Sequence, residues 1–284
     1  MNLLIGSKKL ALLLATATCF ASASAAVVYT NNAGSPTVQA FDLGTGARTL
    51  SFSAPGSNGR GIVVVGNVVY TTDANSGFIS KTNLATGASL GGFQIAGATS
   101  LSTITYDGDN FWVSDYAGTN RAFKISPTGA ILATITLSKS QGNYDGLEYF
   151  NGKLIANKVD GAISTSNQYS VYDLNGMLLI ENFIDTTGRG RGTGIAYNGT
   201  NFYISDLFSN RLTIWSGSTG AYLGALNLVN SANVVEDISF DFEARDDTCR
   251  VNCGGGNGVP VPASLPLLAL GLMGLAAARS KHKA

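Results

Sequence analysis

The sequence TYDGDNFWVSDYAGTNRAFKI (residues 105–125) recurs later in the chain as AYNGTNFYISDLFSNRLTIW (residues 196–215). Both copies contain, in the same order, an Asp-Gly or Asn-Gly turn, an aromatic stretch that ends in Ser-Asp, a polar turn with Asn-Arg, and a further apolar stretch. Such turns between apolar runs are typical of β-hairpins, because glycine tolerates the positive φ that the turn requires. The pair therefore predicts a repeated unit of antiparallel strands.

Related copies fill the sequence around this pair. Weaker copies lie at residues 63–80 and 148–162, and a partial copy begins at residue 27. The polar residues that end the second predicted strand of each copy are Asn31, Asp73, Asp115, Asn157 and Asp206. They are 42, 42, 42 and 49 residues apart, and a period of this length predicts similar units packed side by side.

Each full copy has room for four short strands. In the third copy we expect strands at residues 103–106, 111–114, 121–125 and 131–136, separated by turn residues. The body shows no helical pattern, and four strands in about 42 residues make one blade of a β-propeller. We therefore predict an all-β fold, with a β-propeller over residues 26–248.

The ends of the repeat predict how the ring closes. The first copy lacks its innermost strand, whereas residues 235–241 (VEDISFD) form an inner-strand pattern without a blade of their own. If residues 235–241 supply the missing inner strand of the first copy, the chain forms five four-stranded blades closed by a C-terminal strand. This closure removes the sheet edges that would otherwise be free where the ring begins and ends. The alternatives are a sixth blade, if residues 243–249 form a strand, and a solenoid or a pair of β-sandwiches.

The fifth copy, GIAYNGTNFYISD (residues 194–206), resembles the repeats of the NHL, lactonase-like and virginiamycin-lyase-like propellers. The resemblance is one of repeat style and extends over most of the body. It implies the propeller fold, and because its motifs are structural it implies no activity.

Candidate ligand residues lie at the start of the predicted inner strands, where the mouth of a propeller channel is expected. The repeat register places the following residues at one level: Arg60, Ser102, Asp145, Thr193 and Glu236, with Asp237 next to the last. One arginine and three carboxylates are therefore expected to converge. Such oxygen ligands suit Ca²⁺, the candidate cofactor. The alternative is that they are solvated loop ends or form salt bridges with Arg60.

Histidine limits the possible enzymes. His282, in the C-terminal tail, is the one histidine of the chain, which excludes a Ser-His-Asp triad. The lyase-like propellers use a catalytic histidine that the body lacks. We predict no catalytic residue. A metal-dependent hydrolase of the lactonase type, with Asn157, Asp145 and Glu236 as ligands, remains the alternative to a binding or structural role.

Two further sequence features are interpreted as structural. Residues 187–194 (TGRGRGTG) are glycine-rich but lack the dinucleotide-binding spacing, and we expect an inter-blade loop there. The Ser-Asp and Asn-Arg pairs of the repeats are expected to cap turns and to form hydrogen bonds between blades.

The N-terminus has the pattern of a secretory signal helix, which we assign to residues 1–25. Lys8 and Lys9 precede an apolar stretch at residues 10–17, and Ala23-Ser24-Ala25 provides the small residues that signal peptidase requires. The protein is therefore expected to be exported.

The C-terminal tail, residues 259–284, has three parts. Val259-Pro260-Val261-Pro262 comes first, an apolar run follows to residue 278, and Arg279, Lys281 and Lys283 close the chain. Twenty uncharged residues in a helix reach about 30 Å, enough to cross a membrane. The basic residues would then remain on the cytoplasmic side as a membrane stop.

This order of segments resembles the PEP-CTERM sorting domain of exported bacterial proteins. In that family a Val-Pro-Glu-Pro motif precedes a transmembrane helix and an arginine-rich end, and a membrane protease called exosortase is thought to cut near the motif. Here Val261 replaces the glutamate, and the basic cluster is thinner. The resemblance implies the inner membrane and an exosortase-like protease as partners. It also implies display at the cell surface, with association with exopolysaccharide or biofilm matrix.

The remaining features concern the body and its linker. Cys249 and Cys253 are expected to form a disulfide in an exported protein, before the glycine-rich linker that ends at residue 258. Five of the 18 basic residues lie in the two terminal segments, whereas all 18 acidic residues lie between Asp42 and Asp247. The exported body therefore carries a net charge near −5, which speaks against nucleic acid as a partner.

Overall fold

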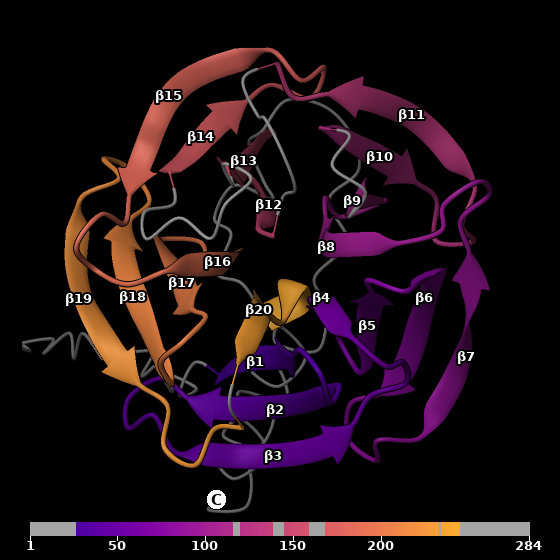
Figure 1. Ribbon diagram of the computed structural model, residues 1–284, viewed down its shortest axis with the longest axis horizontal. Helices are drawn as coiled ribbons and strands as arrows, with labels where there is room; N and C mark the ends of the chain where they lie inside the picture. Colours follow the sequence, from indigo (N-terminus) through magenta and orange to yellow (C-terminus); the bar gives the residue numbers. More distant parts are fainter. Residues whose placement is uncertain (1–26, 116–119, 139–144, 159–167, 233, 245–284) are drawn as a thin grey trace, which may run out of the picture.

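The computed structural model describes residues 27–115, 120–138, 145–158, 168–232 and 234–244. Within these residues the chain forms twenty strands and one turn of 3₁₀-helix, η1 (Phe242–Ala244). The strands make five four-stranded antiparallel sheets arranged as blades around a central axis (Figure 1). The predicted five-bladed β-propeller is confirmed.

The blades follow the order of the chain, and each runs from an inner to an outer strand. Blade A contains β20 (Val235–Phe240), β1 (Val27–Asn32), β2 (Thr37–Asp42) and β3 (Arg48–Ser53). Blade B contains β4 (Gly59–Val65), β5 (Val68–Asp73), β6 (Ser76–Asn83) and β7 (Ser89–Gln94). Blade C contains β8 (Leu101–Tyr106), β9 (Phe111–Asp115), β10 (Arg121–Ile125) and β11 (Ile131–Thr136).

The last two blades complete the ring. Blade D contains β12 (Leu147–Phe150), β13 (Lys153–Lys158), β14 (Gln168–Tyr172) and β15 (Leu178–Asp185). Blade E contains β16 (Gly192–Tyr197), β17 (Asn201–Asp206), β18 (Arg211–Ser216) and β19 (Tyr222–Asn227). The strands predicted for the third copy match blade C, except that β8 begins two residues earlier and β9 ends one residue later than expected.

The ring closes inside blade A, as the sequence predicts. β20 comes last in the chain but pairs antiparallel with β1, with Tyr29 opposite Ser239. Residues 242–244 form η1 rather than the first part of a sixth blade. Closure by β20 leaves the outer strands as the free sheet edges, since every inner strand lies against its neighbours around the axis.

The hydrophobic core lies between the blades, because each blade presents one face of buried side chains to the next. Trp112 of blade C packs in one cluster with Leu147 and Tyr172 of blade D. Tyr203 of blade E packs with Val28 and Phe240 of blade A. The aromatic residues of the second strands therefore join neighbouring blades, while the outer strand β11 is almost entirely exposed.

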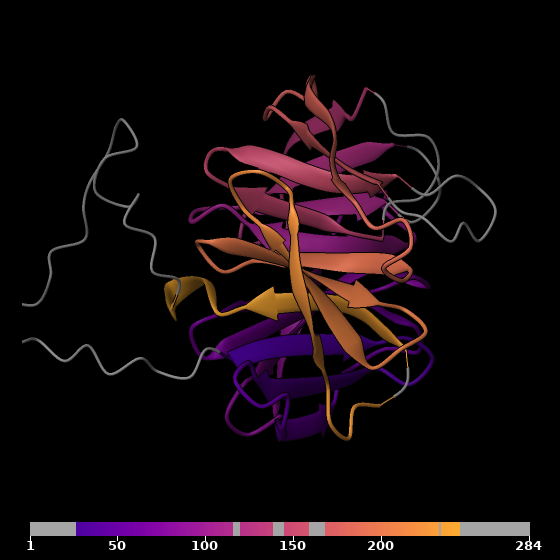
Figure 2. The same cartoon turned by 90° about the vertical axis from the view of Figure 1, so that its left-hand side faces the viewer.

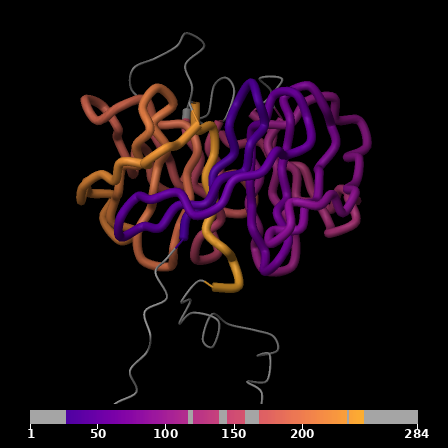
Figure 3. The backbone as a smooth tube through the Cα atoms, turned by 90° about the horizontal axis from the view of Figure 1, so that it is seen from below, coloured from indigo at the N-terminus to yellow at the C-terminus, as the bar shows by residue number. Residues whose placement is uncertain are grey.

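The two faces of the ring differ, because both ends of the described body lie on one of them. β20 ends where β1 begins, since Val28 is paired with Phe240, so both ends of the described body lie on one face (Figures 2 and 3). All five inner strands begin on the opposite face, which we call the mouth face.

Several predictions concern residues outside the described ranges. They are the signal helix over residues 1–25, the Cys249–Cys253 disulfide, the glycine-rich linker, and the tail with Val259, Pro260, Val261, Pro262, Arg279, Lys281 and Lys283. Among the helices of the described ranges, none has the length and apolar character needed to cross a membrane.

Candidate functional site

A β-bulge opens four of the five inner strands at the mouth face. The ladder register shifts between Gly59 and Ile62 in β4, between Leu101 and Ile104 in β8, and between Gly192 and Ile195 in β16. It also shifts in β20, where Val235 and Asp237 pair with the adjacent residues Asn32 and Asn31. A bulge turns the side chains within it away from the regular alternation of a strand. The predicted mouth residues Arg60, Ser102, Thr193 and Glu236 lie within these bulges.

The acidic residues that end the second strands hold the loops that lead into the bulges. In blade B, Asp73 Oδ2 accepts hydrogen bonds from the backbone N–H groups of Ser57 (2.6 Å) and Asn58 (2.7 Å). In blade E, Asp206 accepts from the N–H of Arg191 (3.2 Å) and pairs with Arg211 (2.9 Å). These contacts show the expected turn capping, and the Asn-Arg pattern supplies an ion pair within the blade.

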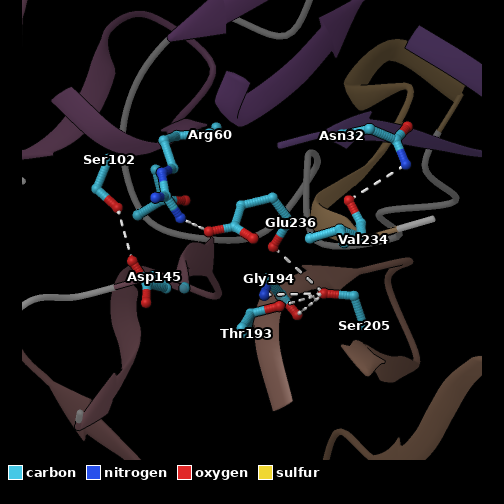
Figure 4. A network of polar contacts seen from close by, with 12 residues as sticks. Asn32, Arg60, Ser102, Asp145, Thr193, Gly194, Ser205, Val234 and Glu236 are labelled. Carbon is cyan, nitrogen blue, oxygen red and sulfur yellow. Dashed lines mark hydrogen bonds and ion pairs between the residues drawn. The ribbon is translucent and has the colours of Figure 1, made fainter. Parts of the chain in front are cut away.

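The mouth itself is organised by an ion pair between blades A and B. The guanidinium of Arg60 pairs with the carboxylate of Glu236, and both side chains are largely buried (Figure 4). Asp145 lies nearby on blade D and accepts a hydrogen bond from the Ser102 hydroxyl at 3.3 Å. Arg60, Glu236 and Asp145 therefore do converge, and the positive charge of Arg60 offsets the negative charges around it.

The electrostatics of Asp145 reflect this network. Burial raises the pKa of the Asp145 carboxyl above its usual value. The positive charge of Arg60, the hydrogen bond from Ser102 and the charge of Arg191 oppose that rise, in decreasing order. Arg191 thus acts on the mouth from the loop before β16, a residue that the register argument did not include.

Thr193 belongs to the sheet rather than to the ligand face. Its hydroxyl lies 2.9 Å from the Ser205 hydroxyl, which accepts a hydrogen bond from the N–H of Gly194 at 2.9 Å (Figure 4). The Ser205 hydroxyl, on the second strand β17, thus satisfies the backbone N–H of Gly194, which the bulge leaves without a ladder partner.

Asp237 lies below the mouth, between the inner strands, and not on the mouth ring where it was expected. Its Oδ2 accepts from the backbone N–H of Ile62 (3.2 Å) and from the Thr103 hydroxyl (2.9 Å), so it joins three blades. Burial raises the pKa of the Asp237 carboxyl well above its usual range, and the hydrogen bonds that it accepts oppose this rise.

The same side of β20 continues this pattern along β4. Ser239 Oγ accepts from the N–H of Val64 (3.1 Å), and Asp241 Oδ1 accepts from the N–H of Gly66 (2.9 Å). Side chains of the closing strand thus bind alternate backbone donors of the next inner strand, which fixes the position of blade A against blade B.

Glycines make this close approach of the inner strands possible. A Cβ on Gly61 would lie 2.6 Å from the backbone nitrogen of Ile104, and one on Gly194 would lie 2.8 Å from the carbonyl oxygen of Glu236. Gly146 of blade D likewise faces the backbone carbonyl of Thr193. In the repeat register these glycines are equivalent to Thr103 and Asp237. The sequence therefore contained a signal for a second ring of residues below the mouth, made of three glycines and two polar residues.

A second buried carboxylate, Glu148, was missed by the sequence argument. Its Oε2 accepts from the Thr105 hydroxyl (2.7 Å), and its Oε1 accepts from the N–H of Tyr197 (3.2 Å), which links blades C, D and E. The sequence signal for it is an acidic residue at the position where the other repeats carry Val63, Thr105, Ala196 and Ser239.

The donor set at the mouth does not fit a metal ion. Glu236 is paired with Arg60, and the Oδ1 atom of Asn157 accepts from the N–H groups of Asp145 (3.1 Å) and Gly146 (3.0 Å). A guanidinium in the cluster would repel a cation. In the described ranges, no group of three or more His, Cys, Asp or Glu side chains is placed to hold a metal. Neither Ca²⁺ nor a metal-dependent hydrolase derives support from this geometry.

Comparisons with known proteins agree at the level of the fold. No protein-family model matches the chain, and no curated protein matches it. A chain in the crystal structure of a nidogen–laminin complex is similar in structure, with a TM-score of 0.55 at 12% sequence identity. The match covers 76% of this chain and 98% of that chain. At this identity the likeness shows the fold alone, a β-propeller.

Proposed function

We propose that this protein is an exported β-propeller that is anchored in the inner membrane by its C-terminal segment and serves a binding or structural role at the cell envelope. The observation that carries the proposal is the placement of the two ends. Both leave the ring on the face opposite the mouth. An anchor attached there would hold the mouth face away from the membrane, where partners can reach it.

The sequence supports the route to that location. Residues 1–25 have the order of a signal peptide, and residues 259–284 have the order of a PEP-CTERM tail. The glycine-rich linker before the tail would separate the ring from the bilayer. The tail's resemblance further suggests display in an exopolysaccharide or biofilm matrix, with signal peptidase and an exosortase-like protease acting in turn.

The chemistry of the mouth favours binding over catalysis. Arg60 and Glu236 form an ion pair, Asp145 is bound by Ser102, and the described ranges contain no histidine that could act as a general base. A rigid ring with varied loops on one face is suited to holding a ligand or partner, because its side chains are fixed before binding.

The test is fractionation and intact-mass measurement of the protein in its native host, with and without residues 259–284. We expect the full chain to lose residues 1–25 and to sediment with membranes, or to be released with a C-terminus near Pro262. The truncated chain should be exported and soluble. A full-length product that retains residues 1–25 in the cytoplasmic fraction would overturn the proposal. A mature chain in the membrane with an uncut tail would restrict it to plain anchoring.

A further inference from the structure

The mouth face of blade E carries two residues that the fold does not require, Arg191 and Phe208. Arg191 lies in the loop before β16, and Phe208 lies in the loop between β17 and β18. Phe208 is 68% exposed, the highest value among the large exposed hydrophobic residues of the described ranges. The Arg191 guanidinium carbon lies 4.8 Å from the centre of the Phe208 ring. A cation is thus held over an exposed aromatic ring.

Blade B provides an internal comparison, because it builds the same loops with other residues. Asn58 and Arg191 both donate their backbone N–H to the aspartate that ends the second strand. Their carbonyls both accept from the residue after that aspartate, at 3.0 Å and 2.9 Å. Asn75 and Phe208 likewise both donate their N–H to that aspartate. The backbone therefore needs neither an arginine nor a phenylalanine at these places.

The charge of Arg191 is not neutralised within the described ranges. The neighbouring Asp206 already accepts from Ser209 (2.6 Å) and Arg211 (2.9 Å) in addition to the loop N–H groups. Arg191 forms no ion pair in the described part of the chain, and Asp145 influences it only at longer range. A second arginine of this loop, Arg189, lies over the Tyr222 ring at 4.1 Å and also forms no ion pair within those ranges.

The loop is fixed before any ligand arrives. Arg191 is bound through both its N–H and its carbonyl, and the carbonyl of Arg189 accepts from the Arg211 guanidinium. A pre-organised guanidinium binds a carboxylate through two parallel hydrogen bonds at little entropic cost. An aromatic face beside it accommodates the apolar face of a ring.

We propose that Arg191 and Phe208 form a binding site for an acidic sugar, whose carboxylate pairs with Arg191 while its ring packs on Phe208. This deepens the binding role proposed above and rests on it. Nucleic acid fits the site less well, because a phosphate backbone needs a row of cations along its length, whereas in the described ranges this loop offers two arginines without an ion pair, Arg189 and Arg191. An anionic membrane would lie on the face opposite this one under the proposed anchoring.

The test is calorimetric titration of the purified full-length protein with an oligogalacturonate, and with its methyl ester as a neutral probe of the same shape. We expect the acid to bind and the ester not to bind. Arg191→Asn and Phe208→Asn, which reproduce the residues of blade B, should each weaken binding about tenfold or more and leave the melting temperature unchanged. The matched controls, Asn58→Ala and Asn75→Ala in blade B, should bind as the parent does.

Three outcomes would overturn the site. They are no binding of the acid at millimolar concentration, equal binding by the Arg191 and Phe208 variants, and binding of single-stranded DNA or phosphatidylserine vesicles in place of the sugar. Because the titration uses purified protein, failure here would leave the location proposed above untouched. Conversely, retention of the protein in the cytoplasm would leave a measured affinity intact.

Discussion

Substitution of Gly61 by alanine tests whether the inner strands touch as closely as the structure indicates. The added Cβ would lie 2.6 Å from the nitrogen of Ile104 and 2.8 Å from the carbonyl oxygen of Ser102, where ordinary contacts begin near 3.4 Å. Both obstacles are backbone atoms of β8, so no side-chain rotation relieves them. The two strands would have to separate by most of an ångström in the middle of the ring.

Over-packing of a closed core costs roughly 1–3 kcal/mol and occasionally more, and an obstacle made of backbone places Gly61→Ala at about 3 kcal/mol. For a domain of this size that corresponds to a fall in melting temperature of about 6–12 °C. The assay is thermal unfolding followed by circular dichroism. Gly224→Ala in the outer strand β19 is the matched control, since a Cβ there meets no atom within 4 Å. If Gly61→Ala melted within about a degree of the parent and of this control, the inferred close approach of β4 and β8 would be refuted.

Three further predictions concern the closing strand and its contacts. Val234 has a φ of 62°, which is costly for a β-branched residue, so Val234→Asn should stabilise the fold by about 1 kcal/mol in denaturant titration; a destabilised variant would contradict this reading. The raised pKa of Asp237 means that the folded state holds this proton more tightly than the unfolded chain, so the free energy of unfolding should fall as pH rises from about 4 towards the folded pKa. Denaturant melts across that range should show the fall in the parent and a flatter curve for Asp237→Asn, and parallel curves would exclude Asp237 as its source. Arg60→Met should cost about 3 kcal/mol by leaving Glu236 buried without its cation, and adding Glu236→Gln should recover most of that loss; additive losses in the double variant would mean that the two side chains do not interact.

The sequence predicted the blades because their signals are local. Asp107-Gly108 and Asn198-Gly199 mark hairpin turns, and the polar residue at the end of each second strand repeats at a nearly constant interval. The first copy lacks an inner strand, and an inner strand without a blade follows the last copy. Pairing these two closes the ring. None of these inferences required knowledge of where any side chain points.

The site was predicted less completely, because it is made of residues from several blades. The register placed Arg60, Asp145 and Glu236 near one another, and the structure brings them together. It also placed Asp237 beside them, whereas the Asp237 carboxylate lies below, bound to Ile62 and Thr103. A one-residue bulge reverses which face a side chain occupies, and a sequence pattern does not reveal where such a bulge lies.

By itself, then, the sequence determined the all-β repeat and predicted the strand that closes it, since turn chemistry and strand period act over a few neighbouring residues; the structure decided for five blades over six. Only the tertiary structure decided that Arg60 neutralises Glu236, that three glycines let the inner strands touch, and that Arg191 lies over Phe208. The physical reason is that these contacts join residues far apart in the chain, and their geometry depends on how five twisted sheets pack around one axis.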